Sequence, residues 1–255
     1  MTPSHEQPST EKLYNQHAQS WVRTEPTILS DYTARPRVLE RAGAVQGKSV
    51  LDLGCGEGYV ARLLAERGTA SIVGIDQSEE MILGARTRNT IDEFEIEYIH
   101  TSATSWTPPR ESFDLALAVF LLNYLTVDES VASLKRAHAS LRPEGKLIMT
   151  LPHPSLPWLR PEEPPFYFRK PAKGYKESRD EELKGFIWSR NGGAVPVRCR
   201  HKTLTDIFEI VRRSGFDGPV HLEELCVTDA HLAFDYDFFG PLKGSPLHLL
   251  VELTR

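Results

Sequence analysis

The sequence contains little cysteine, which limits how its fold can be stabilised. Three cysteines, Cys55, Cys199 and Cys226, are spread over 255 residues, and no two of them have the C-x-x-C spacing. A disulfide framework needs a denser set of cysteines and an oxidising compartment. The sequence therefore argues against such a framework and fits the reducing cytoplasm.

Basic clusters and long apolar runs are also missing. The net charge is −5, and lysine and arginine form no basic run, whereas a nucleic-acid partner normally requires a basic patch. No apolar run approaches the roughly 20 residues that span a bilayer. The N-terminal segment MTPSHEQPST lacks the basic-then-apolar pattern of a secretion signal. We expect a soluble, cytoplasmic protein without a nucleic-acid or membrane partner. The overall charge does not exclude a local basic patch.

The most informative segment is VLDLGCGEG, residues 50–58. Apolar residues surround the acid Asp52, and three glycines follow at alternate positions, Gly54, Gly56 and Gly58, before a helical pattern begins. Glycine permits positive φ and lets a ligand press against bare backbone. The first amides of the following helix also lack intrahelical partners. Such a turn lies at the carboxyl end of a strand, where α/β sheets bind small ligands.

Two later segments narrow the ligand. A dinucleotide fold would show G-x-G-x-x-G with an acid about 20 residues on, whereas here the glycines follow G-x-G-x-G. The next predicted strand, 71–75, ends in Asp76, whose carboxylate can accept both hydroxyls of a ribose, and Ser78 can cap the helix that follows. A third strand, 96–100, leads into the small polar turn 101–104, which suits a purine edge.

These elements occur in the order typical of one superfamily. From about Lys48 to Leu151 the sequence resembles the class I S-adenosylmethionine-dependent methyltransferases. VLDLGCGEG resembles their first motif, GIDQSEEM the second, HTSATSW the adenine loop, FDLALAVFLLNYL the fourth strand, and LKRAHASLRPEGKLIMTL the next helix and strand. Within this superfamily the chain is similar to the bacterial small-molecule branch, including the toxoflavin-type N-methyltransferases. The alternative is a tight strand–helix turn in another nucleotide-binding fold.

The resemblance implies a fold of the α/β class. We expect one Rossmann-like methyltransferase domain over residues 1–255, with a seven-stranded, mostly parallel sheet, an antiparallel last strand and helices on both faces. Its expected parts are a flexible tail (1–9), an N-terminal helical cap (10–45), a cofactor-binding core (46–151), a lid insertion (152–200), and a C-terminal helix with a strand hairpin (201–255). Core strands are expected near 48–53, 71–75, 96–100, 113–119 and 146–151.

The segment 152–200 breaks the alternation of strand and helix. It is rich in proline and aromatic residues, whereas disordered segments are poor in aromatics. A long irregular segment inside a compact domain is usually functional or disordered. We interpret it as an ordered aromatic lid over the site, and the alternatives are a pad on the sheet edge or a dimer contact.

The resemblance also implies S-adenosylmethionine as the cofactor, with S-adenosylhomocysteine as its product. The glycines would admit the methionine portion, Asp52 would anchor its ammonium or organise the loop, and Asp76 would take the ribose. Tyr14 would fold over the cofactor, or else pack an amphipathic helix. The expected cofactor-binding residues are Tyr14, Asp52, Gly54, Cys55, Gly56, Gly58, Asp76, Gln77, Met81, Ser102, Ala103, Thr104, Val119 and Phe120.

The acceptor side is inferred from position. His153 follows the fifth strand and His201 precedes the last large helix, so both are candidate catalytic residues. A general base is needed only when the acceptor must lose a proton for attack. The expected substrate-binding residues are Tyr124, Trp158, Phe166 and Tyr167. No His, Asp or Glu cluster has metal-ligand spacing, so no metal is expected, although a magnesium-assisted mechanism stays open.

Together these features predict an enzyme that methylates nitrogen or oxygen of a small aromatic or heterocyclic metabolite, because a flat apolar wall suits a flat acceptor. Two alternatives belong to other classes. The chain could be a protein or nucleic-acid methyltransferase, or a cofactor-binding partner subunit without catalysis. A monomer and a homodimer are both open.

Overall fold

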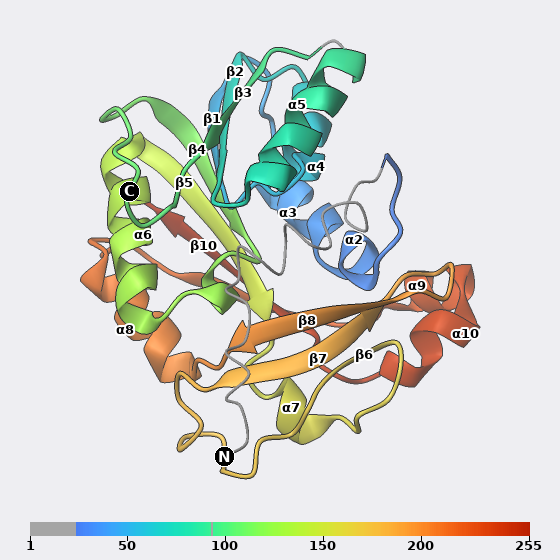
Figure 1. Ribbon diagram of the computed structural model, residues 1–255. Coiled ribbons are helices and arrows are strands. Elements are labelled where there is room, and N and C mark those ends of the chain that lie inside the picture. Colours follow the sequence, from blue (N-terminus) through green and yellow to red (C-terminus); the bar gives the residue numbers. More distant parts are fainter. Residues whose placement is uncertain (1–23, 93) are drawn as a thin grey trace, which may run out of the picture.

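The protein is built on one seven-stranded sheet in the order β3-β2-β1-β4-β5-β10-β9 (Figure 1). The computed structural model describes residues 24–92 and 94–255. β10 runs antiparallel to both of its neighbours, and the other neighbouring strands are parallel. The predicted Rossmann-like sheet is thereby confirmed. The strands are β1 (Ser49–Leu53), β2 (Ser71–Asp76), β3 (Ile96–His100), β4 (Phe113–Val119), β5 (Leu141–Pro152), β9 (His221–Leu225) and β10 (His248–Thr254).

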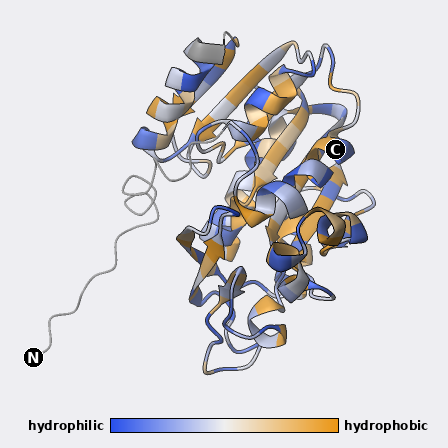
Figure 2. Ribbon diagram, turned by 90° about the vertical axis from the view of Figure 1, so that its right-hand side faces the viewer, coloured by the Kyte–Doolittle hydropathy of each residue, from blue (hydrophilic) through white to orange (hydrophobic). Residues whose placement is uncertain are grey.

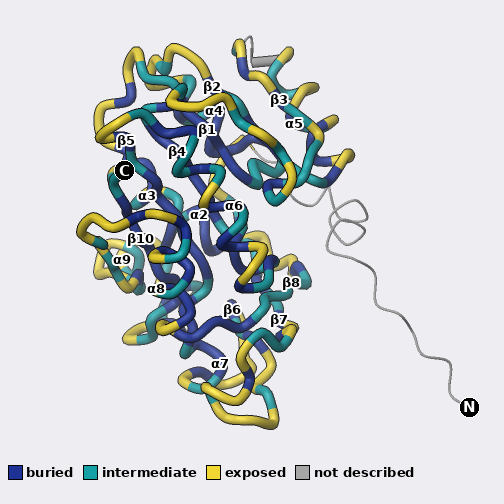
Figure 3. The backbone as a smooth tube through the Cα atoms, turned by 90° about the vertical axis from the view of Figure 1, so that its left-hand side faces the viewer, coloured by how far each residue is buried: buried dark blue, intermediate teal, exposed yellow. Residues whose placement is uncertain are grey.

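Helices cover both faces of this sheet because its strands are apolar on both sides. In β4, Leu115 and Leu117 pack toward α3, α4 and α5, whereas Ala116 and Ala118 pack toward α6 and α8. The central strands β1 and β4 and the strand β10 are accordingly almost wholly buried (Figure 3), and much of the main sheet is hydrophobic (Figure 2). The helices are α2 (Leu29–Thr33), α3 (Arg35–Ala42), α4 (Tyr59–Ala65), α5 (Glu79–Asp92), α6 (Val127–Ser140) and α8 (Leu204–Arg213).

The fifth strand differs from its prediction. It begins at Leu141, directly where α6 ends, and not near residue 146. Phe113 pairs with Leu141 before a register shift in the β4–β5 ladder. Pro143 and Gly145 therefore lie inside a strand with an irregular register, and their turn-like sequence concealed its start.

The insertion is ordered and contains a second sheet, which the sequence did not predict. Its three antiparallel strands are β6 (Phe166–Phe168), β7 (Glu182–Trp188) and β8 (Ala194–Arg200), and α7 (Leu156–Leu159) precedes them. At Gly185 of β7 an added Cβ would lie 2.0 Å from the carbonyl oxygen of Tyr167. A side chain at this position would thus separate β6 from β7.

The second sheet has its own apolar core. Phe166, Phe168 and Ile187 pack there against α10 (Tyr236–Phe239), which follows α9 (Asp229–Phe234), and against the short turn η2 (Gly240–Leu242). This core anchors the insertion to the end of the main sheet from which β10 starts. None of the helices within 24–92 and 94–255 is long and apolar enough to cross a bilayer.

Candidate active site

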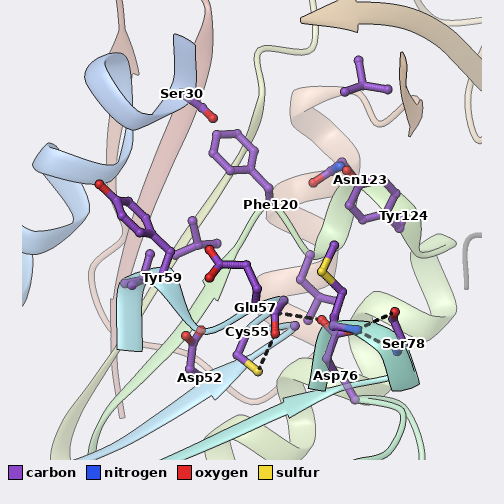
Figure 4. A pocket seen from close by; sticks show the side chains of 18 of the residues that line it. Ser30, Asp52, Cys55, Glu57, Tyr59, Asp76, Ser78, Phe120, Asn123 and Tyr124 are labelled. Carbon is purple, nitrogen blue, oxygen red and sulfur yellow. Dashed lines mark hydrogen bonds between the residues drawn. The ribbon is translucent and has the colours of Figure 1, made fainter. Parts of the chain in front are cut away.

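The main cavity lies where β1, β2 and β4 end and extends to the β6–β8 sheet (Figure 4). Its volume is about 160 Å³. Backbone and acids of the predicted cofactor core form one side of it, and aromatic residues that follow β4 or belong to the insertion form the other. Two segments far apart in the sequence thus share one pocket.

The glycine turn adopts the conformation that its sequence predicts. The φ angles of Gly54, Gly56 and Gly58 are 70°, 57° and 80°, a region that favours glycine. A Cβ at Gly58 would lie 2.1 Å from Oη of Tyr98, so this glycine makes room for the tyrosine below it. A Cβ at Gly56 would meet nothing within 4 Å, so the backbone there borders open space.

Asp76 holds this turn in place. Its Oδ2 accepts a hydrogen bond from the amide of Gly56 at 2.9 Å, and its Oδ1 accepts one from the amide of Ser78 at 2.9 Å (Figure 4). Burial raises the pKa of Asp76, and these two backbone amides oppose the rise. Each carboxylate oxygen has further acceptor capacity, so the group can hold the turn and still accept from a ligand.

Asp52 is a buried acid whose pKa is strongly raised. It is 2% exposed and lines the pocket, and no described residue donates a hydrogen bond to its carboxylate. Burial, and then the charge of Asp76, raise the pKa of Asp52 to about 7. A ligand ammonium placed there would stabilise the charged carboxylate.

Most of the predicted cofactor residues come together at the pocket. Those that line it are Asp52, Gly54, Cys55, Gly56, Asp76, Gln77, Met81, Ser102, Ala103, Val119 and Phe120. Gly58 and Thr104 do not line it. Gly58 caps α4 above Tyr98, and Oγ1 of Thr104 lies 2.8 Å from Oγ of Ser102, which it can orient. Tyr14 and the tail 1–9 fall outside the described residues.

Phe120 directly follows β4 in a strained conformation. Its φ of 57° is unusual for an aromatic residue, and such strain tends to occur at functional sites. Its ring packs edge-on against His248 at 5.2 Å between centroids, and Arg35 lies over it at 5.3 Å. The ring therefore forms a fixed wall between the two halves of the pocket.

The insertion contributes only part of the predicted acceptor wall. Phe166 lines the pocket as predicted, together with Tyr124 of the turn η1 (Leu122–Tyr124). Tyr167 does not, because successive side chains of β6 point to opposite faces, and it packs on Trp188 at 5.9 Å. Trp158 also lies away from the pocket and packs on His201 at 4.8 Å. Phe168 takes the second inward position on β6.

The two predicted catalytic histidines do not reach the main cavity. Both line a separate cavity of about 10 Å³, which has room for about one water molecule. Nε2 of His153 lies 2.7 Å from Oε1 of Glu224, and its Nδ1 accepts from the amide of Ser155 at 3.2 Å. Nε2 of His201 lies 2.8 Å from the carbonyl oxygen of Tyr175. Their geometry suits structural support, so we propose neither of them as a base.

His248 and Asn123 are two pocket residues that the sequence analysis missed. They are 1% and 3% exposed, and both line the main cavity. Nδ1 of His248 and Oδ1 of Asn123 have no hydrogen-bond partner among the described residues. Burial, followed by the charge of Arg35, lowers the pKa of His248 to about 3. For His248, the sequence signal was a histidine at the start of a mostly apolar strand. The same pattern is typical of a histidine packed in the core.

No group of three or more His, Cys, Asp or Glu residues in the described part of the chain could hold a metal ion.

Comparisons with known proteins agree with this geometry. A sequence-family model described as "Methyltransferase domain" matches residues 50–145, which extend from β1 into β5. An S-adenosylmethionine dependent methyltransferase from Mesorhizobium loti has a similar structure, with a TM-score of 0.64 and 23% identity over 86% of this chain and 96% of that one. That likeness concerns the fold. The family model thus assigns residues 50–145 to a methyltransferase domain, and the strand order and the glycine turn agree with the fold of the class I S-adenosylmethionine-dependent methyltransferases.

Curated relatives match over shorter stretches. The chain is 28% identical over 155 residues to a ubiquinone biosynthesis O-methyltransferase of Coxiella burnetii, covering 59% of this chain and 65% of that protein. It is 36% identical over 125 residues to a trans-aconitate 2-methyltransferase of Variovorax paradoxus, covering 48% of this chain and 46% of that protein. The matches thus span less than two thirds of both relatives.

The pocket fits the cofactor that this family implies. The open space beside Gly56 can receive the methionine portion of S-adenosylmethionine without meeting a side chain. Asp52 offers a buried carboxylate to its ammonium, and Asp76 offers acceptor capacity to its ribose. The groups on this side of the pocket therefore agree with the family assignment.

Proposed function

We propose that the chain is an enzyme that transfers a methyl group from S-adenosylmethionine to nitrogen or oxygen of a small aromatic or heterocyclic metabolite. The observation that carries the proposal is one pocket with two unlike sides. Gly56 and Asp76 border one side, and Phe166 and Phe168 of β6 border the other. Pockets that combine apolar walls with a few placed polar groups are typical of small-molecule sites.

The residues of the pocket contribute mainly by holding the reactants. Bound S-adenosylmethionine supplies a methyl group on a positively charged sulfur. In our proposal Asp52 binds the ammonium, Asp76 binds the ribose, and the turn at Ala103 meets the adenine edge. Phe120 and the β6 aromatics exclude water and keep a flat acceptor in line with the methyl group, and such positioning supplies much of the acceleration in reactions of this kind.

The named relatives support a small-molecule acceptor. Their names refer to ubiquinone biosynthesis and to trans-aconitate, and both point to acceptors of low molecular mass. The aromatic wall at Phe166 and Phe168 favours a flat one. A cytoplasmic location and a monomeric or homodimeric state stay predictions from the sequence.

Turnover on small molecules tests the proposal. Purified protein is incubated with S-adenosylmethionine and a panel of phenols and nitrogen heterocycles, and S-adenosylhomocysteine is quantified by mass spectrometry. We expect product with one or more panel members, and much less product with an Asp76→Ala variant at limiting S-adenosylmethionine. Product formed only when protein or nucleic acid is added would indicate a macromolecular methyltransferase. Donor binding without turnover under any condition would indicate a non-catalytic partner subunit.

A further inference from the structure

The acceptor side of the pocket contains two buried atoms that need hydrogen-bond donors. Buried polar groups in native proteins almost always have partners, so an unpartnered one in a ligand cavity indicates a ligand contact. Nδ1 of His248 and Oδ1 of Asn123 are such atoms within the described ranges, and both residues line the main cavity. They come from β10 and η1, so two separate elements present them.

The tautomer of His248 follows from its neighbours. The hydroxyl of Thr33 donates its only hydrogen to the carbonyl oxygen of Leu29 at 3.0 Å. Its Oγ1 lies 2.9 Å from Nε2 of His248, and with its hydrogen directed to Leu29 it accepts a hydrogen from that nitrogen. Since a neutral imidazole carries one N–H, Nδ1 is left with a lone pair. It is an acceptor that nothing in the described chain satisfies.

The imidazole is also held rigidly. Phe120 packs edge-on against it at 5.2 Å, and Phe166 lies tilted beside it at 5.6 Å between centroids. Its backbone begins β10, between β5 and β9, where it pairs with Pro152 and Leu225. A ring fixed by two aromatic neighbours and a central strand suits a directional contact.

Asn123 supplies the second acceptor. It lies on the η1 turn beside Tyr124, and its carboxamide extends into the pocket toward Phe120 (Figure 4). Nζ of Lys202 donates hydrogen bonds to the carbonyl oxygens of Leu122 and Leu125, which flank this turn. The turn that carries Asn123 is thus fastened to the segment after β8.

We propose that His248 Nδ1 and Asn123 Oδ1 form the polar contacts of the acceptor site, and that they select a flat acceptor which presents N–H or O–H groups to them. This inference rests on the proposed function and specifies its substrate class. The imidazole binds and orients the acceptor as a neutral ring, and burial among aromatic residues keeps it uncharged at neutral pH. A methyl acceptor that carries no N–H or O–H group would leave both atoms without a hydrogen bond. Such a compound should bind about tenfold or more weakly.

Paired probes test this selection. Protein saturated with S-adenosylhomocysteine is titrated with benzimidazole and 1-methylbenzimidazole, and with catechol and 1,2-dimethoxybenzene, and the affinities are measured by ligand-observed NMR. In at least one pair, we expect the member that carries the N–H or O–H group to bind about tenfold more tightly. Equal affinity within both pairs, or no binding of any probe, would overturn the proposal.

Matched variants locate the selection. His248→Leu and Asn123→Leu remove the acceptor atoms, whereas His248→Asn and Asn123→Asp keep an oxygen acceptor near each place. The Leu variants should lose the preference and the conservative variants should retain it. His221→Leu, at an exposed histidine of β9, is the control and should behave like the parent protein. A preference that survives both Leu changes would also overturn the proposal.

The affinity of each variant for S-adenosylhomocysteine separates this proposal from the proposed function. We expect this affinity to stay within about threefold of the parent value, because His248 and Asn123 lie outside the side of the pocket assigned to S-adenosylmethionine. Failure of the parent protein to bind S-adenosylhomocysteine would contradict the proposed function itself. Normal donor binding without probe selectivity would contradict only the inference about the acceptor.

Discussion

The carboxylate of Asp76 accepts a hydrogen bond from the amide of Gly56 at 2.9 Å, so the acid that ends β2 fixes the glycine turn that follows β1. The turn and the acid are therefore one unit. In the proposed function, the same carboxylate that shapes the backbone at Gly56 also binds the ribose. A change at Asp76 should affect both.

Asp76→Ala should weaken the binding of S-adenosylhomocysteine by about 10- to 100-fold, because hydrogen bonds to a charged group are lost and the Gly56 amide is left without its acceptor. Isothermal titration calorimetry measures the affinity. Glu80→Ala is the control, since Glu80 is an exposed acid in the first turn of α5. An unchanged affinity in Asp76→Ala would remove this acid from the donor site.

Gly58→Ala should destabilise the protein more than Gly43→Ala does. Both glycines have positive φ, at 80° and 65°, so both substitutions carry a backbone cost. Only at Gly58 does the new Cβ collide with Tyr98, whereas nothing lies within 4 Å of one at Gly43. We expect an extra loss of about 1–3 kcal/mol in the free energy of unfolding, measured by urea denaturation. Equal losses would mean that Tyr98 adjusts without cost.

Donor binding should release a proton near pH 7. The pKa of Asp52 is raised to about 7 by burial and by Asp76, and a bound ammonium would lower it. On the order of half a proton should leave at pH 7. The apparent binding enthalpy of S-adenosylhomocysteine should then differ between phosphate and Tris buffers. Asp52→Asn should abolish that difference, and a buffer dependence that persists in the variant would assign the proton to another group.

His248 should make the stability of the protein fall in mild acid. Burial, Arg35 and His153 lower its pKa from 6.5 to about 3. Between these values the unfolded chain binds the proton and the folded protein does not, so stability is full above pH 6.5 and falls as the pH decreases toward 3.

Urea unfolding at pH 7.0 and 5.5 measures this contribution. The parent protein should lose about 1 kcal/mol more than His248→Leu between the two pH values. His221→Leu should lose as much as the parent. Identical pH dependence of the parent protein and His248→Leu would show that folding does not lower the pKa of His248.

Local sequence patterns predicted most of the residues that line the glycine-turn side of the pocket, for a physical reason. The glycines at 54, 56 and 58 and the acids at 52 and 76 act within or beside their own strand–helix turns, so short segments carry the information. The parallel strands were found because each is a compact apolar run between such turns.

The acceptor side depends on contacts between distant segments. The three strands of the insertion lie among prolines and turns, and their pairing is set by neighbours such as Gly185 and Tyr167. His248 reaches the pocket only because β10 inserts between β5 and β9. His153 follows the fifth strand and His201 precedes the last large helix, as predicted, but both line a second, smaller cavity. No local pattern distinguishes these outcomes.

A crystal structure with S-adenosylhomocysteine tests the central claim most directly. The account predicts ribose hydroxyls on Asp76, the ammonium at Asp52, and the adenine beside Ala103. It predicts that the sulfur faces the part of the pocket lined by His248 and Asn123, where the acceptor is expected. An adenosine bound elsewhere, or a sulfur that faces away from that space, would contradict it.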